Sequence, residues 1–334
     1  MSAKLTLITE IVTGIGMLPE TSLETVFLGP SAPHQLQGVD PETWNQLCGL
    51  WAEDTFASTF EKAFAHGRYF LSARGGLRGR PPVKVEWKGP HRPPEHDPLP
   101  ADLRVDDVYI VSCKNDSKVL SNPSPRALFR SALRSDAAKG VDWYGEIAPE
   151  EYRALYTACV GMAGFVGFPD SPLELTRAQR DQLKMRFRRK WPHELSGEVA
   201  AFNVAVSHRS ASALNSALSA KADRERFYWR LLRLHSAPYF ILGDQPSGPT
   251  RLRVLTPWDF RRRFRFSGLD VDADVAGQPQ ITWSASFADL EQDLQIPTRG
   301  HVEIRWSHGK FCGAPEAKIY LDTPHVDACG YQAI

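Results

Sequence analysis

The sequence predicts an α+β protein with more than one folded unit, and three observations support this prediction. The chain has 334 residues, which is more than one hydrophobic core usually holds. Hydrophobic residues make up 42% of the chain, enough to build packed cores. Stretches with helical spacing of apolar residues and stretches with strand-like alternation both occur, in different parts of the sequence.

The amino-terminal segment and the cysteines indicate a cytoplasmic protein. Residues 4–18 are moderately apolar but contain Glu10 and several threonines, and no small-residue cleavage site follows, so we expect no secretory signal. The five cysteines are odd in number and never occur with CxxC spacing, which argues against a disulfide framework and a cysteine zinc site. No run of about eighteen apolar residues exists, so we expect no membrane-spanning helix.

The first strong element is a helix that begins at Asp40. Asp40 is a good N-cap residue, and Pro41 suits the first helical position. The spacing of large apolar residues predicts one helix over about 41–65. Asp54 and Glu61 are seven positions apart, so they would lie on nearly one line of this helix.

Two strands are expected next. Residues 83–88 alternate apolar with charged residues, which would place Lys84, Glu86 and Lys88 on one face. Residues 108–113 form a nearly continuous β-prone run, typical of a central strand that is covered on both faces. We expect the two strands to be neighbours in one sheet.

The rest of the chain is predicted to be helical and then β-rich. Expected helices cover 126–134, 150–160, 176–191 and a pair within 197–235; expected strands cover 239–242, 251–255, 280–287, 301–306 and 317–322. We therefore predict four consecutive segments: an amino-terminal segment 1–40, an α/β core 41–150, a mostly helical basic region 151–265 and a β-rich region 266–334.

Two short runs on either side of the second strand resemble the PD-(D/E)xK nuclease superfamily. Residues 100–102 read Pro-Ala-Asp and residues 111–114 read Val-Ser-Cys-Lys, with ten positions between Asp102 and Ser112. That superfamily places an aspartate near the start of one strand and an acid-x-lysine on the next. The resemblance covers about 41–136. It implies a restriction-endonuclease-like α/β core that hydrolyses phosphodiester bonds with Mg²⁺ or Mn²⁺, which oxygen ligands hold.

The resemblance assigns a role to each of three residues. Asp102 would be a metal ligand, and Lys114 would position the attacking water and the phosphate. Ser112 stands where the superfamily usually has an acid, and it would support them. Alternation puts Ser112 and Lys114 on the same strand face. In the alternative interpretation, Asp102 only caps a turn and Lys114 only ends a strand.

A serine is a poor ligand for a divalent metal ion, so a carboxylate from elsewhere is expected. Glu86 is the candidate, with Asp54 or Glu61 as a further ligand. Alternatively, Glu86 pairs with a neighbouring lysine, and the two helical acids form a polar helix edge. Glu86-x-Lys88 is a second acid-x-lysine, but no acid between Glu61 and Glu86 can serve as its upstream partner.

The charge distribution indicates a polyanionic partner. The net charge is only +1, yet residues 177–265 contain 19 Lys and Arg against 7 Asp and Glu. Such a concentration of positive charge is typical of surfaces that neutralise phosphates and release counterions. Two clusters are the candidate nucleic-acid-binding residues: Lys184, Arg186, Arg188, Arg189 and Lys190 in the first, and Arg261, Arg262 and Arg263 in the second. A solvated basic face or a dock for an acidic protein surface is the alternative.

Together these patterns predict a Mg²⁺-dependent endonuclease acting on nucleic acid, with DNA favoured over RNA. By analogy, a restriction or antiviral defence role in a prokaryote would suit such a protein. A non-catalytic nucleic-acid-binding subunit on a decayed nuclease fold is the second interpretation, because of Ser112. An adaptor that docks an acidic protein is the third. A protein partner or a homo-oligomer is left open.

Overall fold

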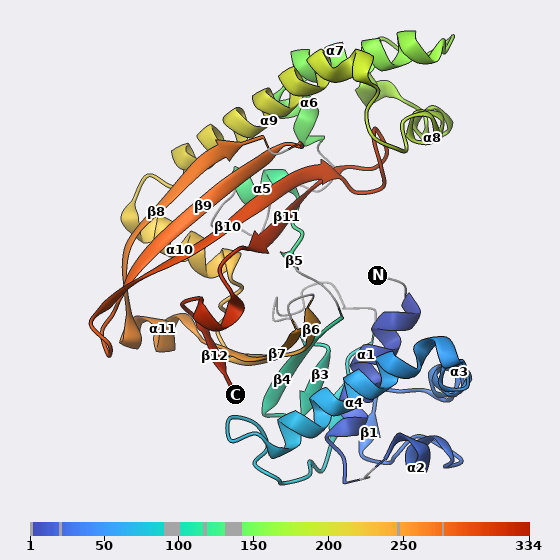
Figure 1. Ribbon diagram of the computed structural model, residues 1–334, viewed down its shortest axis with the longest axis vertical. Helices are drawn as coiled ribbons and strands as arrows, with labels where there is room; N and C mark the ends of the chain where they lie inside the picture. Colours follow the sequence, from blue (N-terminus) through green and yellow to red (C-terminus); the bar gives the residue numbers. More distant parts are fainter. Residues whose placement is uncertain are drawn as a thin grey trace. The chain divides into compact units, whose positions relative to one another are not determined.

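The computed structural model describes residues 3–19, 22–89, 101–115, 119–130, 142–245, 248–275 and 277–334. These residues form a mixed α+β structure with a seven-stranded sheet and a five-stranded sheet (Figure 1). The predicted α+β class is therefore confirmed. No helix within the described ranges is both long and apolar enough to cross a membrane.

The chain divides into two units, each built from segments that are far apart in the sequence. Unit 1 comprises the described residues within 1–118, 233–263 and 325–334, and unit 2 those within 119–232 and 264–324. The four consecutive segments expected from the sequence do not coincide with these units. The reason is strand pairing: β6 (Tyr239–Gln245) lies parallel to β4 (Tyr109–Lys114), which brings residues of the predicted basic region into unit 1.

Unit 1 contains the seven-stranded sheet, in the strand order β1-β2-β3-β4-β6-β7-β12. Its further strands are β1 (Leu36–Gln37), β2 (Val85–Trp87), β3 (Leu103–Val105), β7 (Gly248–Val254) and β12 (Tyr331–Ala333). Its helices are α1 (Ala3–Gly16), α2 (Leu23–Phe27), α3 (Pro41–Trp51), α4 (Ala57–Ser72) and α11 (Pro257–Arg263), with short 3-10 turns η1 (Asp54–Phe56) and η4 (His325–Asp327).

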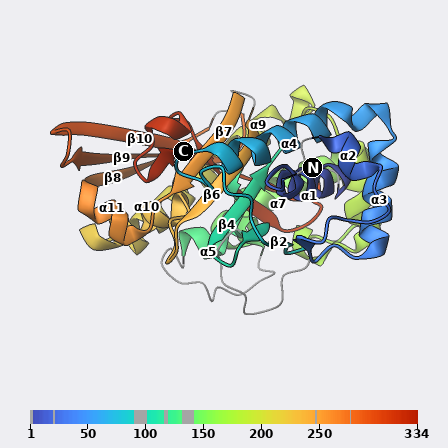
Figure 2. The same ribbon diagram turned by 90° about the horizontal axis from the view of Figure 1, so that it is seen from below.

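Helices α1 and α4 lie side by side on one face of this sheet (Figures 1 and 2). The buried face of α1, including Ile8, Ile11 and Ile15, packs in one core with strand residues such as Val111 and Leu242. On the opposite face β2 and β3 carry Glu86 and Arg104, whereas β6 and β7 bury Tyr239, Ile241 and Leu252, because side chains alternate along each strand.

The single helix predicted over 41–65 is wrong. The structure has α3, the turn η1 and then α4, which continues to Ser72. The ring of Phe27 stacks on Trp51 at 5.2 Å and meets Phe60 edge-on at 5.5 Å, so both residues must face the same ring. One straight helix would not bring the two side chains together in this way, and the chain therefore turns between them.

The two strands expected to be neighbours belong to one sheet but are not adjacent. Strand β3 lies between them, paired antiparallel with β2 and with β4. The sequence did not predict β3, because it has only three residues and follows a proline-rich stretch. The expectation that β4 is central is correct, since it pairs with β3 on one side and β6 on the other.

Unit 2 contains the five-stranded antiparallel sheet, in the order β5-β11-β10-β9-β8. Its strands are β5 (Val119–Ser121), β8 (Phe264–Asp274), β9 (Gln280–Asp289), β10 (Leu294–Trp306) and β11 (Pro315–Leu321). Its helices are α5 (Pro125–Phe129), α6 (Trp143–Ile147), α7 (Pro149–Ala163), α8 (Arg177–Arg186), α9 (Ser196–Ala217) and α10 (Lys221–Leu231), with turns η2 (Pro172–Glu174) and η3 (His193–Leu195).

The predicted helices and strands of this region largely agree with unit 2. The pair within 197–235 corresponds to α9 and α10, and three C-terminal strands correspond to β9, β10 and β11. Helix α9 packs along β8 and β9 (Figure 1). Strand β9 buries every second residue, so its alternation predicted it well. The helix expected over 126–134 is described only as α5, since 131–141 lie outside the described residues.

Candidate functional site

The structure brings Asp102 and β4 together where the superfamily resemblance placed the site. This place is the edge of the sheet that the ends of its strands form. The backbone N–H of Asp102 donates to the carbonyl of Val111 at 2.9 Å. Its carboxylate Oδ2 accepts from the hydroxyl of Ser112 at 3.1 Å and from the backbone N–H of Cys113 at 2.7 Å. Asp102 is thus fixed beside Lys114, the last residue of β4.

Glu10 is a second acid near this edge, and it comes from helix α1. Its Oε2 accepts a hydrogen bond from the indole Nε1 of Trp87 at 2.7 Å. Burial raises the pKa of Cys113 well above its usual range, and the nearby carboxylates of Asp102 and Glu10 raise it further. Glu10 was not predicted as a site residue, because in the sequence it only interrupts an apolar segment. A single acid within an apolar helix is the signal that could have found it.

The neighbouring strand β6 supplies another carboxylate, Asp244. Lys114 pairs with Gly243, whose φ is +150° and where an added Cβ would lie 1.9 Å from the Lys114 carbonyl oxygen. Only glycine allows the two parallel strands to approach so closely here. Asp244 follows immediately, so it and Lys114 lie at the carboxyl ends of adjacent parallel strands. Ligands of α/β sheets commonly bind at such ends.

His66 from α4 holds Asp244 in place. Its Nε2 lies 3.3 Å from Oδ2 of Asp244, and its Nδ1 accepts from Nε of Arg251 at 3.4 Å. The His66 side chain is only 4% exposed, whereas that of Asp244 is 20% exposed. Burial lowers the pKa of His66, and Asp244 opposes this effect without overcoming it. The imidazole is therefore neutral near pH 7, with Nε2–H directed at Asp244.

A small recess of about 80 Å³ lies at these strand ends. Lys62, His66, Lys114, Asn115 and Asp244 line it, together with small residues of α1 and α4. At about 30 Å³ for each water, it holds only a few water molecules. Two lysines and one carboxylate are therefore among its lining residues.

His325 also lies near Lys114 in unit 1. Its ring Nε2 is 3.1 Å from Nε2 of Gln245, and its ring stacks on Tyr331 at 5.7 Å. Burial lowers the pKa of His325 to about 4, and the Lys114 ammonium contributes to this shift. His325 is therefore neutral near pH 7 as well.

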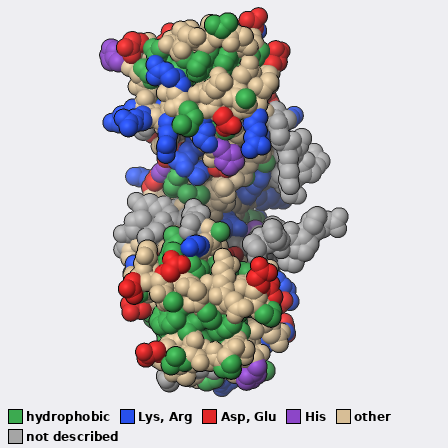
Figure 3. Space-filling view, turned by 90° about the vertical axis from the view of Figure 1, so that its right-hand side faces the viewer, with side chains coloured by type: hydrophobic (Ala, Val, Ile, Leu, Met, Phe, Trp, Pro, Cys, Tyr) green, Lys and Arg blue, Asp and Glu red, His purple; other side chains and the backbone are tan. Residues whose placement is uncertain are grey.

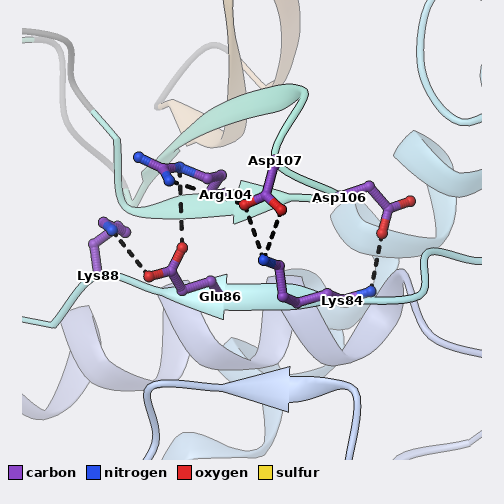
Figure 4. A network of polar contacts seen from close by, with 6 residues as sticks. All are labelled: Lys84, Glu86, Lys88, Arg104, Asp106 and Asp107. Carbon is purple, nitrogen blue, oxygen red and sulfur yellow. Dashed lines mark hydrogen bonds and ion pairs between the residues drawn. The ribbon is translucent and has the colours of Figure 1, made fainter.

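Glu86 is already balanced by basic neighbours. Its carboxylate lies 3.0 Å from Nζ of Lys88 and 3.9 Å from Nε of Arg104 (Figure 4). Lys84 lies on the same face, as predicted, and its Nζ is 2.7 Å from Asp107. These contacts match the alternative interpretation of Glu86 as one partner of a surface ion-pair network.

The structure does not bring Asp54 and Glu61 to Asp102. Asp54 begins the turn η1, and Glu61 lies on α4; both side chains are exposed. The buried residues of α4, such as Phe60 and His66, face its core, so Glu61 points to solvent. In the described part of the chain, no three or more His, Cys, Asp or Glu side chains group so that they could hold a metal ion. The Mg²⁺ or Mn²⁺ site therefore stays a prediction.

The first basic cluster lies in unit 2, at the end of α8. Arg186, Arg188, Arg189 and Lys190 are exposed, while Phe187 between them is buried. Lys184 is half-buried on α8. Figure 3 shows Lys and Arg side chains gathered on the face of unit 2 that this view presents. Four of the five cluster residues are therefore accessible from solvent.

The second basic cluster lies on α11 in unit 1. Arg261, Arg262 and Arg263 form the last turn of this helix. The guanidinium of Arg262 lies 4.8 Å from the ring centre of Trp258, which is 66% exposed. An exposed tryptophan covered by an arginine can stack on a base, but a structural cation–π pair has the same geometry.

Searches against family models, curated proteins and solved structures gave no match to this chain.

Proposed function

We propose that this protein hydrolyses phosphodiester bonds of nucleic acid, with DNA favoured over RNA. The observation that carries the proposal is the position of Asp102, whose carboxylate is hydrogen-bonded to Ser112 and Cys113 beside Lys114. Sequence spacing alone suggested this grouping, and the strand register of β3 and β4 supports it.

The recess supports the same reaction class. In hydrolysis, water adds to phosphorus, one P–O bond breaks, and the leaving oxygen takes up a proton. Negative charge grows on the phosphate oxygens in the transition state, and Lys62 and Lys114, which both line the recess, would stabilise it through their ammonium groups. Asp244 can accept the proton of the attacking water, because His66 fixes only its Oδ2.

A metal ion would neutralise phosphate charge and acidify the water if one binds at this edge. Asp102 is the described residue that the resemblance assigns as a metal ligand, and its carboxylate already accepts a hydrogen bond from the Ser112 hydroxyl. Asp116, close by in sequence, lies outside the described residues. The described side chains thus do not make a complete metal site, and the steps above depend on the chain's own residues.

The second candidate is a nucleic-acid-binding protein without catalytic activity. Ser112 favours it: the serine is 3% exposed and its hydroxyl is used by Asp102, so it is integrated into the fold and poorly placed as a ligand. Exposed arginines such as Arg186 and Arg188 would provide binding without chemistry.

The test is cleavage by the purified full chain. Supercoiled DNA, linear DNA and single-stranded RNA are incubated with Mg²⁺, with Mn²⁺ and with EDTA. We expect metal-stimulated cleavage of DNA that Lys114→Ala strongly reduces and Lys84→Ala leaves intact, because Lys84 pairs with Asp107 in the turn between β3 and β4 and does not line the recess. Binding of all substrates without cleavage under any condition would favour the second candidate. Absence of both binding and cleavage would favour the protein adaptor.

A further inference from the structure

Unit 2 contains a cavity of about 750 Å³ that the proposed cleavage site does not use. It lies among the end of β10, helix α9, the turn between β8 and β9, and the residues after α8. Pockets that enclose small ligands have volumes of roughly 300–1,000 Å³, so this cavity has the capacity for a nucleotide-sized molecule.

Aromatic rings form the base of the cavity. Trp306 stacks on Phe202 with ring centres 5.8 Å apart and planes 13° apart, and Tyr144 meets Trp306 edge-on at 4.9 Å. Phe202 and Tyr144 are almost fully buried, whereas Trp306 and Trp191 are only half-buried. Phe202 covers one face of Trp306 and Lys310 covers one face of Trp191, and the remaining exposed part of each ring is the surface on which a base could stack.

Asn203 provides a polar group in the same cavity. It follows Phe202 on α9, lines the cavity and is only 8% exposed. Its side-chain amide makes no hydrogen bond with another described residue. Although the residue is largely buried, its amide atoms still reach the solvent of the cavity, so a ligand can hydrogen-bond with them in place of water. An amide offers one acceptor and two donors, which is the pattern that reads the edge of a nucleobase.

The rim of the cavity is positively charged. Arg189, Lys190 and Arg305 are exposed there, and half-buried Lys310 donates through its Nζ to the carbonyl oxygen of Arg189. Nζ of Lys310 lies 3.9 Å from the ring centre of Trp191, and burial lowers the pKa of Lys310. Because cationic side chains line a cavity with an aromatic base, the cavity is suited to a ligand that is both aromatic and anionic.

We propose that this cavity binds one unstacked nucleotide of a nucleic acid strand. The base would stack on Trp306 or Trp191 and hydrogen-bond with Asn203, while Arg189 and Lys190 contact its phosphates. Bases inside a duplex are stacked and paired, so the nucleotide must come from a single strand, a strand end or an extruded position. The proposal deepens the proposed function, since it depends on nucleic acid being the partner.

The test uses an oligonucleotide with 2-aminopurine at its centre, whose fluorescence falls when the base stacks on an aromatic ring. DNA and RNA versions, each single-stranded and in a duplex, are titrated with the full chain. We expect a fluorescence change for the single strands that differs from the duplex response, and comparison of DNA with RNA identifies the source of the nucleotide.

Variants then assign the signal to the cavity. Asn203→Leu preserves size but removes the amide, and it should weaken single-strand binding by about tenfold or more. Trp191→Leu should weaken it by a similar factor. Val204→Ala is the matched control, because Val204 is the next residue of α9, is exposed and does not line the cavity. Thermal melting checks that each variant is folded. If Asn203→Leu does not fold, the binding measured for Trp191→Leu decides the test.

Two outcomes would overturn the inference and are distinguishable from failure of the proposed function. If single strands bind equally well to the parent chain, Asn203→Leu and Trp191→Leu, the cavity is not the site, although cleavage of DNA can still be observed. If neither single strands nor duplex bind and nothing is cleaved, both the inference and the proposed function are wrong.

Discussion

Nε2 of His66 lies 3.3 Å from Oδ2 of Asp244, and this contact joins helix α4 to the end of strand β6. Arg251, on the adjacent strand β7, donates to the other ring nitrogen at 3.4 Å. An imidazole that accepts at Nδ1 must carry its proton at Nε2, so Arg251 fixes the tautomer that donates to Asp244. The arrangement orients Asp244 without using all of its oxygen lone pairs.

The first prediction concerns this contact. His66→Leu should lower the free energy of unfolding by about 1–3 kcal/mol, because Asp244 and Arg251 each lose a partner. His66→Gln should lose less, since its amide N–H can replace Nε2–H. Urea denaturation measures both. Glu61→Gln, on the exposed face of the same helix, is the control and should change nothing. If His66→Leu and His66→Gln lower the free energy of unfolding equally, the contact does not stabilise the fold.

The second prediction concerns catalysis. Lys114→Ala and Asp102→Asn should each reduce the rate of DNA cleavage by about 10²–10³, because both residues act on the transition state. Fold and DNA affinity should largely persist. Cleavage rates and binding isotherms are measured on the same preparations. Unchanged cleavage in both variants would show that the reaction does not take place at the strand ends of β3 and β4.

Asp244 provides a third prediction at the same edge. Asp244→Asn should reduce cleavage without weakening DNA binding, because removal of the carboxylate removes a proton acceptor but no cationic contact. Urea denaturation of the same variant is the further measurement. A loss of cleavage that accompanies an equal loss of stability would instead indicate a purely structural role.

Ser112 allows a direct test of metal binding. The serine is 3% exposed and donates to Asp102, so Ser112→Glu would place a second carboxylate in a buried position. We expect a lower melting temperature without metal, and a melting temperature that rises with Mg²⁺ concentration if the two carboxylates bind the ion. Ser112→Ala is the control, which should show no Mg²⁺ dependence beyond that of the parent chain.

Local chemistry made parts of the fold predictable. The Asp40 cap is confirmed, since its carboxylate accepts from the backbone N–H of Thr43 at 2.7 Å. The alternation of Lys84 and Glu86 on one face and the buried alternation of β9 also agree with the structure. In each case the signal lies within a few consecutive residues.

Long-range pairing could not be predicted in the same way. Strand β6 is far from β4 in sequence, and no local pattern states that Lys114 lies opposite Gly243. For that reason Asp244 and His66 were missed, although both contribute to the recess. Glu86 was selected by its alternation, but Arg104 on the unpredicted strand β3 is one of its partners. The candidate site could be found only in part, because its residues meet through tertiary structure.

The basic cluster after α8 leads to a prediction about salt. Replacing Arg186, Arg188, Arg189 and Lys190 with Ala should weaken duplex binding similarly for all sequences. Each lost phosphate contact should reduce the slope of log K against log salt concentration by about 0.9. Lys221→Ala with Arg226→Ala, two exposed residues of α10, is the matched control. An unchanged slope in the quadruple variant would assign this surface to an acidic protein partner.

The last prediction concerns the effect of pH through His325. Burial lowers its pKa to about 4 in the folded chain, whereas an unfolded histidine has a pKa near 6.5. Between these values the unfolded chain binds more protons than the folded chain, so the free energy of unfolding should fall as the pH decreases from about 6.5 to about 4. The loss from this group is at most about 3 kcal/mol. His325→Gln should flatten the curve in this range, while His34→Gln, at an exposed position, should leave it unchanged.

An NMR titration of the His325 ring measures the pKa directly. This pKa should rise in Lys114→Ala yet stay below 6.5, because burial is the larger cause of the shift. A His325 pKa that does not respond to removal of Lys114 would contradict the placement of that ammonium beside the ring.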